Sequence, residues 1–405
     1  MEDHLSFLFS DSVDYKDTWV VDPYRRLRTS SPFGMFNSSL QNSINHTEWE
    51  IITSGTAAET YLPFESAASL TIGTANGDRC LRQTLKTFQY QTGTGTQVLM
   101  TGVLNVTQNG TAARLGIYDD LNGLFFEVKD GVFNVVLRKT LSVGNTVEIR
   151  VPQSEFNIDK LDGTGQGGYN IDLTKAQLFN IDYAWLGVGR VRFGVWSGTC
   201  FCYCHEFKYN NVLDTVYMGK GDLPIRFELI NTQAVASSSA MKQICTAVFV
   251  EGGLNQQAYS RSVLMGPGSF YSPPNDNNWY NLIALRLKNN AQRVSVKLSS
   301  FSNVSDANRA FQLGVFKNAN LPTLTYSDAS DYTEFGLLGG QVTGGVLIAA
   351  DVGIGQRTQT SFDLTTVKDM INLRYDGTSE TFALCVRRID SAPEVSAILN
   401  FFEIR

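Results

Sequence analysis

From about residue 50 onward, the chain consists of short runs in which apolar and polar residues alternate, separated by glycine, asparagine, aspartate and serine. A period of two is typical of half-buried β-strands, because successive side chains point to opposite faces of a sheet. The clearest runs in the first half of the chain are 84–90, 97–106, 113–118, 124–128 and 132–138. Short strands at such close spacing favour an antiparallel sandwich or barrel.

The segments between these runs have the composition of tight turns. Asp130-Gly131 separates two of the predicted strands, and Asn122-Gly123 precedes the first of them. Both dipeptides favour the positive φ angles that close a two-residue β-hairpin. Helical periodicity is weak, because 173–179 and 361–373 allow at most a short helix each. We therefore predict an all-β fold.

A change of composition suggests how the chain is divided. Residues 252–278 show little periodicity and contain Gly266-Pro267-Gly268 and the Pro273-Pro274 pair, which is typical of a boundary between domains. We predict two antiparallel β-sandwich domains of jelly-roll or lectin-like type, preceded by an extended N-terminal arm. The predicted segments are an arm at 1–50, a first sandwich at 51–253, a linker at 254–278 and a second sandwich at 279–405.

Charge narrows the classes of partner. The 405 residues include 33 Lys+Arg and 39 Asp+Glu, for a net charge of −6, with no long basic block. Such a balance argues against electrostatic binding to nucleic acid or to an anionic membrane. No window holds the roughly 18 apolar residues of a membrane-spanning helix, and the first residues, MEDHLSFLFS, lack the basic-then-apolar order of a secretory signal. We expect synthesis in a cytosol-like compartment, with reduced thiols and no nucleic-acid or membrane partner.

One cluster has the composition of a metal site. Cys200, Cys202, Cys204 and His205 together form a possible ligand set for zinc. On a strand, however, residues two apart lie about 6 to 7 Å from one another in a row, and His205 faces the opposite side. We therefore predict that the three thiols line a core face, with no bound metal.

Acidic residues offer little for catalysis. Asp119, Asp120, Asp159 and Asp162 lie in turn-like sequence, where aspartate bonds the local backbone; only Glu127 lies within a predicted strand. The glycine-rich stretch 161–168 lacks the GK[ST] ending of a phosphate-binding loop. We expect no enzymatic activity, no catalytic residue and no cofactor. A glycosidase remains an alternative, for which Glu127→Gln is the test.

The remaining candidate functional residues are ones that would form an interface with another subunit. Tyr24, Arg25, Arg26 and Arg28 form a short basic arm, whose three charges are too few to dominate nucleic-acid binding. We predict that the arm packs on a neighbouring subunit. Trp279 is a further interface candidate, although aromatic residues of this kind fit a core or a sugar-stacking surface equally well.

One block is more specific than these patterns. It comprises 151–165 (VPQSEFNIDKLDGTG), 171–177 (IDLTKAQ) and 181–194 (IDYAWLGVGRVRFG), with supporting pieces at 21–28 and 97–104. It resembles a capsid- or fibre-type β-sandwich module in virion structural proteins of tailed bacteriophages and large DNA viruses. The resemblance covers roughly residues 20–253.

The resemblance implies a location. It predicts a viral structural protein of the virion, such as a capsid-associated, minor capsid or fibre protein. Such a protein is made in the host cytoplasm and acts through contacts with copies of itself and with other virion proteins. The alternative is a carbohydrate-binding protein for host attachment, with a host glycan as partner. A glycan array separates the two.

Overall fold

The computed structural model describes residues 21–24, 26, 28, 32–252, 258–266, 268–291, 294–306, 309–353, 359–389 and 393–404. The chain divides into two compact units, Met1–Asn255 and Gln256–Arg405. Within the described residues, the helical segments are two single 3-10 turns, Pro63–Glu65 and Gln153–Glu155, and none is long and apolar enough to cross a membrane. The predicted all-β fold class is confirmed.

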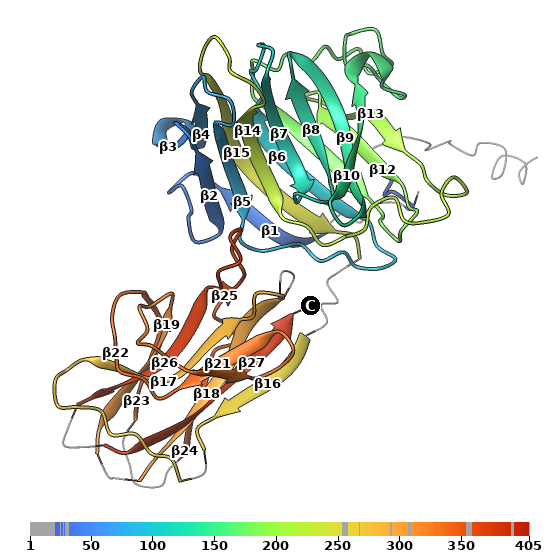
Figure 1. The fold of residues 1–405 in the computed structure, drawn as a ribbon. Helices are drawn as coiled ribbons and strands as arrows, with labels where there is room; N and C mark the ends of the chain where they lie inside the picture. The colour runs from blue at the N-terminus through green and yellow to red at the C-terminus, as the bar shows by residue number, and fades with distance from the viewer. Residues whose placement is uncertain are drawn as a thin grey trace, which may run out of the picture. The chain divides into compact units, whose positions relative to one another are not determined.

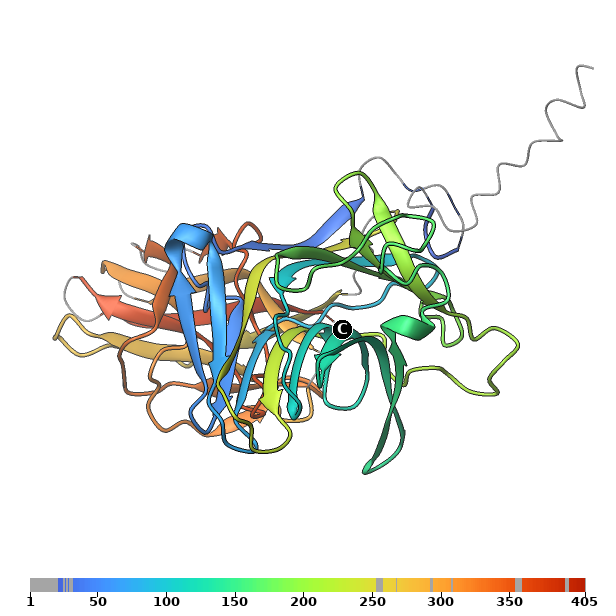
Figure 2. The same cartoon turned by 90° about the horizontal axis from the view of Figure 1, so that it is seen from above.

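The first unit is an antiparallel β-sandwich of two sheets (Figures 1 and 2). The eight-stranded sheet has the order β13-β12-β11-β6-β15-β4-β3, with β1 also paired to β15. Its strands are β1 (Phe33–Ser39), β3 (Ala58–Leu62), β4 (Ala67–Ile72), β6 (Thr96–Val103), β11 (Gln177–Tyr183), β12 (Val191–Trp196), β13 (Phe201–Phe207) and β15 (Ser239–Val250). Many of its neighbours are distant in sequence, as in a jelly roll.

The seven-stranded sheet of the first unit has the order β10-β9-β8-β7-β14-β5-β2. Its strands are β2 (Trp49–Ser54), β5 (Arg79–Thr84), β7 (Thr111–Tyr118), β8 (Gly123–Lys129), β9 (Val132–Ser142), β10 (Asn145–Pro152) and β14 (Ile225–Asn231). The predicted turn between β8 and β9 is present, because Asp130 and Gly131 have φ angles of 54° and 76°. Both lie in the left-handed region that a type I′ hairpin requires.

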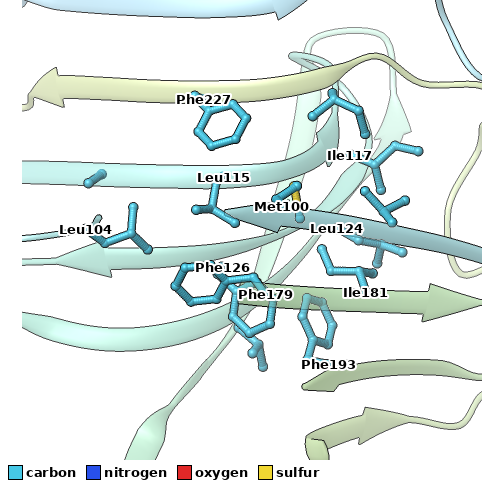
Figure 3. Packing of buried hydrophobic residues seen from close by; sticks show 14 of the residues in the cluster. Met100, Leu104, Leu115, Ile117, Leu124, Phe126, Phe179, Ile181, Phe193 and Phe227 are labelled. Carbon is cyan, nitrogen blue, oxygen red and sulfur yellow. The ribbon is translucent and has the colours of Figure 1, made fainter. Parts of the chain in front are cut away.

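The core of the first unit lies between its two sheets. Figure 3 shows Met100, Phe179 and Phe193 from one sheet meeting Leu115 and Phe126 from the other. All five side chains are fully buried. Because each strand alternates, these residues leave the intervening positions for the outer faces of the sheets.

The second unit is also built from two antiparallel sheets. One has the order β16-β27-β18-β24, with β25 on β18, and the other has the order β20-β21-β17-β26-β19-β23, with β22 on β17. Its strands are β16 (Ala258–Leu264), β17 (Trp279–Leu287), β18 (Ser295–Ser305), β19 (Phe311–Lys317), β20 (Tyr326–Asp328), β21 (Thr333–Leu337), β22 (Gln341–Val342), β23 (Val346–Gly353), β24 (Gln359–Asp363), β25 (Met370–Ile371), β26 (Thr381–Arg388) and β27 (Val395–Ile404). A separate core includes Leu285, Phe301, Leu313, Phe382 and Phe401.

The boundaries of the units differ from those in the sequence prediction. Strand β1 lies within the predicted arm yet pairs with β15, and β2 begins at Trp49. Strand β16 lies within the predicted linker and pairs with β27 along its whole length. Both β1 (FGMFNSS) and β16 (AYSRSVL) are edge strands of mixed composition, so their weak alternation did not distinguish them from loops.

Candidate functional site

The outer face of the seven-stranded sheet carries an array of arginines and glutamates, which we call the charged face. Its members are Arg79 on β5, Arg114 on β7, Glu127 on β8, Arg138 on β9, Glu148 and Arg150 on β10, and Arg226 and Glu228 on β14. The strand register places opposite charges directly across from each other. Arg114 pairs with Glu127 on one side and with Glu228 on the other, and Arg138 pairs with Glu148. Directly opposed charges of unlike sign stabilise a sheet.

The two central carboxylates share one guanidinium. The Nε of Arg114 donates to Oε1 of Glu127 at 2.8 Å, and its Nη1 donates to Oε2 of Glu228 at 3.0 Å. Each carboxylate has a second arginine, because Arg150 bonds Glu127 at 2.5 Å and Arg79 bonds Glu228 at 2.6 Å. Glu127 is 0 % and Glu228 3 % exposed. Such pairing offsets the cost of burying these charges.

An aromatic layer lies among these charges. Tyr118 and Phe125, with Val136, form a buried cluster of their own outside the main core. The guanidinium of Arg138 lies 5.3 Å from the Tyr118 ring and 5.0 Å from the Phe125 ring. Arginine over an aromatic face gains a cation–π attraction. The guanidinium groups are thus held in fixed planes by rings as well as by carboxylates.

A hollow of about 590 Å³ opens on the charged face. Its lining is Arg79, Arg114, Asp120, Arg138, Thr146, Glu148, Glu228 and Ile230. Seven of these eight side chains are charged or carry a hydroxyl, and Asp120 and Glu148 are 53 % and 25 % exposed. The hollow therefore presents hydrogen-bond donors and acceptors side by side, as a ligand with many hydroxyl groups requires.

Two carboxylates of the hollow, Glu148 and Glu228, are ionised near neutral pH. Burial alone raises the pKa of Glu228, but the charges of Arg114 and Arg79 outweigh it and lower that pKa to about 2. Burial also opposes ionisation of Glu148, whereas the hydrogen bond and charge of Arg138 lower its pKa overall. A carboxyl group with so low a pKa holds no proton to donate at neutral pH. Glu228 is thus an acceptor in this site.

The described residues of the predicted basic arm, Tyr24, Arg26 and Arg28, make the following contacts within the first unit. Arg28 bonds Asp182 and also bonds Glu251 at 2.7 Å, and the Tyr24 hydroxyl lies 3.0 Å from that of Tyr90. Arg26 pairs with Asp22 at 2.7 Å. These contacts lie within one chain, so the packing of the arm on a neighbouring subunit stays a prediction. Arg25 lies outside the described residues.

Trp279, the other interface candidate, lies at the start of β17. Its ring centroid is 5.3 Å from that of Phe316, and the guanidinium of Arg387 lies 4.7 Å from it. It belongs with a small apolar cluster of the second unit that is separate from the main core. Its role at an interface also stays a prediction.

The side chains of Cys200, Cys202, Cys204 and His205 do not converge on a common metal-binding position. Cys202 and Cys204 face the core of the first unit, and no group of three potential metal-binding side chains meets within the described ranges. The expectation that His205 faces the opposite side is wrong. A register shift between β12 and β13 turns its ring toward Phe156 and Phe207 in the core, where burial lowers its pKa to about 4 against the opposing charge of Glu206.

The six cysteines carry free thiols. Four are buried, Cys80, Cys202, Cys204 and Cys385, and two are partly exposed, Cys200 and Cys245. Burial raises the pKa of the Cys385 and Cys204 thiols far above the ordinary value. A thiol with so high a pKa is inert at neutral pH, because the thiolate is the reactive form.

The aspartates behave as turn residues, as predicted. Oδ1 of Asp119 accepts from the backbone N–H of Leu121 at 2.7 Å, and Oδ1 of Asp159 accepts from that of Leu161 at 2.8 Å. Asp120 is the exception, because its carboxylate bonds Arg226 at 2.7 Å and lines the hollow. Sequence reasoning found Glu127 and Asp120 but none of the arginines that surround them.

No known family model and no curated protein sequence matches the chain. Among solved structures, it is similar to a β-glucanase of Bacillus licheniformis at 10% identity and a TM-score of 0.36, covering 55% of this chain and 99% of that one. It is also similar to a legume lectin-like domain of Entamoeba histolytica at 8% identity and a TM-score of 0.33, covering 55% of this chain and 100% of that one. At such low identities and scores, we transfer no residue role.

These comparisons correct one expectation. The sequence led us to expect a protein without enzymatic activity, yet the similar solved structures include two of glycoside hydrolase family 16 enzymes from Bacteroides ovatus. These similar structures thus contradict the expectation of a non-enzyme, without assigning an activity to this chain. The similar structures include both glycanases and carbohydrate-recognition domains.

Proposed function

We propose that this chain binds glycans, and that the ligand lies in the hollow of the charged face. The observation that carries the proposal is the alternation of guanidinium and carboxylate groups around that hollow of about 590 Å³. Carboxylates accept and guanidinium groups donate, so neighbouring members of the array match the paired hydroxyls of a sugar ring. The second of the two functions expected from the sequence is thus the one that the geometry supports.

The side chains around the hollow are preorganised for ligand binding. Arg114, Glu127 and Glu228 are fixed by one another and by the aromatic layer beneath. Ligand binding then costs little side-chain entropy, because the rotamers are already set. The lining holds three arginines and three carboxylates. Its balanced charge favours an uncharged glycan over a strongly anionic one.

A glycan array of neutral and acidic oligosaccharides, probed with the whole chain, tests the proposal. We expect a neutral glycan to give the strongest signal. Asp120→Asn and Glu148→Gln each replace a charged carboxylate of the lining with a neutral amide of the same shape, and each should weaken binding of that glycan about tenfold, which corresponds to about 1.4 kcal/mol. Calorimetric titration measures the change.

Glu65→Gln is the matched control, because Glu65 is an exposed carboxylate that pairs with Lys242 away from the charged face. It should bind as the unaltered chain does. Absence of glycan binding, or equal affinity in all three variants, would contradict the proposal.

An experiment with the same glycan distinguishes binding from cleavage. The chosen glycan is incubated with the chain, and mass spectrometry follows its length. A glycan of unchanged length would show binding without cleavage. Shortened products that disappear in Glu127→Gln would instead make this chain a glycanase, with Glu127 in its machinery.

We propose, separately, that the chain belongs to a virus particle, on the strength of the sequence resemblance over residues 20–253. Peptides of the chain should then be found by mass spectrometry in purified particles. Their consistent absence from such particles would remove this proposal without affecting glycan binding.

A further inference from the structure

The second unit contains a cavity of about 690 Å³ that has no counterpart in the proposed function. It lies beside the outer face of the β17-containing sheet, where Arg286 and Thr381 face each other across β17 and β26. The lining is Arg286, Leu287, Asn289, Ala319, Leu321, Pro322, Thr323, Leu324, Tyr326, Asp376, Gly377, Thr378, Ser379 and Thr381. Its volume lies within the range typical of small-molecule sites.

Two glycines allow the apolar side of the cavity, formed by Pro322 and Leu324, to pack close to the sheet. A Cβ on Gly336 would lie 3.0 Å from Leu324, and one on Gly339 would lie 2.7 Å from both Leu324 and Pro322. These two glycines let the segment containing Pro322 and Leu324 pack directly on the strands. The cavity between this segment and Arg286 is therefore fixed by backbone positions.

Arg286 is fixed at the polar side of the cavity. Its guanidinium lies 3.6 Å from the centroid of the Tyr326 ring, and its Nε donates to Oε1 of Glu334 at 2.5 Å. Among the described residues, its two terminal amino groups have no hydrogen-bond partner. A guanidinium held in one plane presents such a pair of donors as a fork.

The turn on the opposite side supplies acceptors. Oδ1 of Asp376 accepts from the backbone N–H of Thr378 at 2.8 Å and from its hydroxyl at 2.6 Å. These hydrogen bonds lower the pKa of Asp376, so its carboxylate is ionised at neutral pH. Arg286 and Asp376 are the two charged residues of the lining, so their charges balance.

We propose that this cavity is a second ligand site, which takes one uncharged sugar unit. The donor fork of Arg286 faces hydroxyl or ring oxygens, Asp376 accepts from a hydroxyl, and the C–H face of the sugar packs on Pro322 and Leu324. The balanced charge of the lining favours an uncharged sugar over an anionic one. The site lies within the second unit and does not depend on the charged face of the first.

Saturation-transfer NMR on the whole chain tests the site with methyl β-glucoside, methyl β-galactoside, methyl α-mannoside, N-acetylglucosamine and glucuronic acid. We expect at least one neutral sugar to receive saturation and glucuronic acid to receive less. Arg286→Met removes the donor fork and should weaken binding of that sugar at least tenfold. Thr381→Trp, which fills the cavity from β26, should do the same.

Arg261→Met is the matched control. Arg261 is 38 % exposed against 41 % for Arg286, pairs with Glu403 and lies near Tyr259, but is not part of the cavity lining. It should leave binding unchanged. The further inference is overturned if no neutral sugar binds, if glucuronic acid binds best, or if both cavity variants bind normally. Loss in Glu148→Gln alone would place the ligand on the charged face and leave the second site refuted.

Discussion

His205 shows how a single buried side chain links packing to pH. Its ring lies 4.7 Å from Phe207 and 6.0 Å from Phe156, and its Nδ1 accepts from the backbone N–H of Asn157 at 3.3 Å. The side chain is only 6 % exposed. Protonation would place a charge among these rings, which is why the pKa of His205 falls to about 4.

This environment predicts a loss of stability on mild acidification. The pKa in the folded chain, about 4, lies below the ordinary value of 6.5. Between these pH values, the unfolded chain binds the proton more tightly, so acid favours unfolding. We expect His205 to account for about 2 kcal/mol of lost stability between pH 7 and pH 5. Urea unfolding of the chain and of His205→Gln at both pH values measures the difference.

His46→Gln is the comparison variant, because His46 is 55 % exposed and lies outside the core that surrounds His205. Equal losses in His205→Gln and the unaltered chain would show that His205 is not the group responsible. The sequence could not reveal this environment. Strict alternation places His205 opposite Cys204, and the extra residue at the register shift is set by how β12 and β13 pair.

At the scale of elements, the charged face depends on the close approach of β7 and β8. A Cβ on Gly116 would lie 2.2 Å from the carbonyl oxygen of Leu124 and 2.5 Å from Cα of Phe125. Both are backbone positions, which cannot rotate away. The absence of a side chain at Gly116 therefore lets Phe125 lie over β7, beneath the arginines.

Gly116→Ala should consequently destabilise the first unit by about 1 to 3 kcal/mol, the usual cost of overpacking. It should also weaken glycan binding, because Phe125 supports Arg114 and Arg138. Urea unfolding and calorimetric titration measure the two effects. Gly219→Ala is the comparison, since its Cβ would meet only Asn122 Oδ1 at 3.4 Å. Similar losses in both variants would argue against the close approach as the cause.

The positions of strands and turns could be predicted from the sequence, but which strands pair with each other could not. The runs at 113–118, 124–128 and 132–138 fall within β7, β8 and β9, and Asp130-Gly131 fixes the turn of the last pair. Arg114 and Glu127 lie 13 residues apart, a separation that a hairpin can bring together. Arg114 and Glu228 lie 114 residues apart. Their meeting depends on the pairing of β7 with β14, and no local pattern contains that information.

At the scale of the whole molecule, each unit has the core that independent folding requires. The first core is formed between the two sheets of Met1–Asn255 and the second between those of Gln256–Arg405. The sequence predicted two sandwiches but placed the start of the second near 279. In the structure, the second unit includes β16 and so begins by about residue 258, because β16 pairs with β27, the last strand of that unit.

Residues 256–405 expressed alone should therefore fold and unfold cooperatively. Thermal denaturation followed by circular dichroism measures the transition, and the whole chain should show one at the same temperature. A fragment beginning at residue 279 lacks β16 and should be markedly less stable, because the edge of β27 is then uncovered. Equal stability of the two fragments would place the boundary where the sequence prediction had it.

The distribution of the thiols provides a chemical reporter for each unit. Five cysteines belong to the first unit, and Cys385, buried on β26, belongs to the second. A buried thiol reacts with an alkylating reagent only when the structure around it opens. Alkylation of Cys385, followed over time by peptide mass spectrometry, therefore reports the opening of the small apolar cluster around β26 in the second unit. Alkylation of Cys204 reports the opening of the core of the first unit in the same way. The two thiols therefore follow the two units separately, without any engineered label.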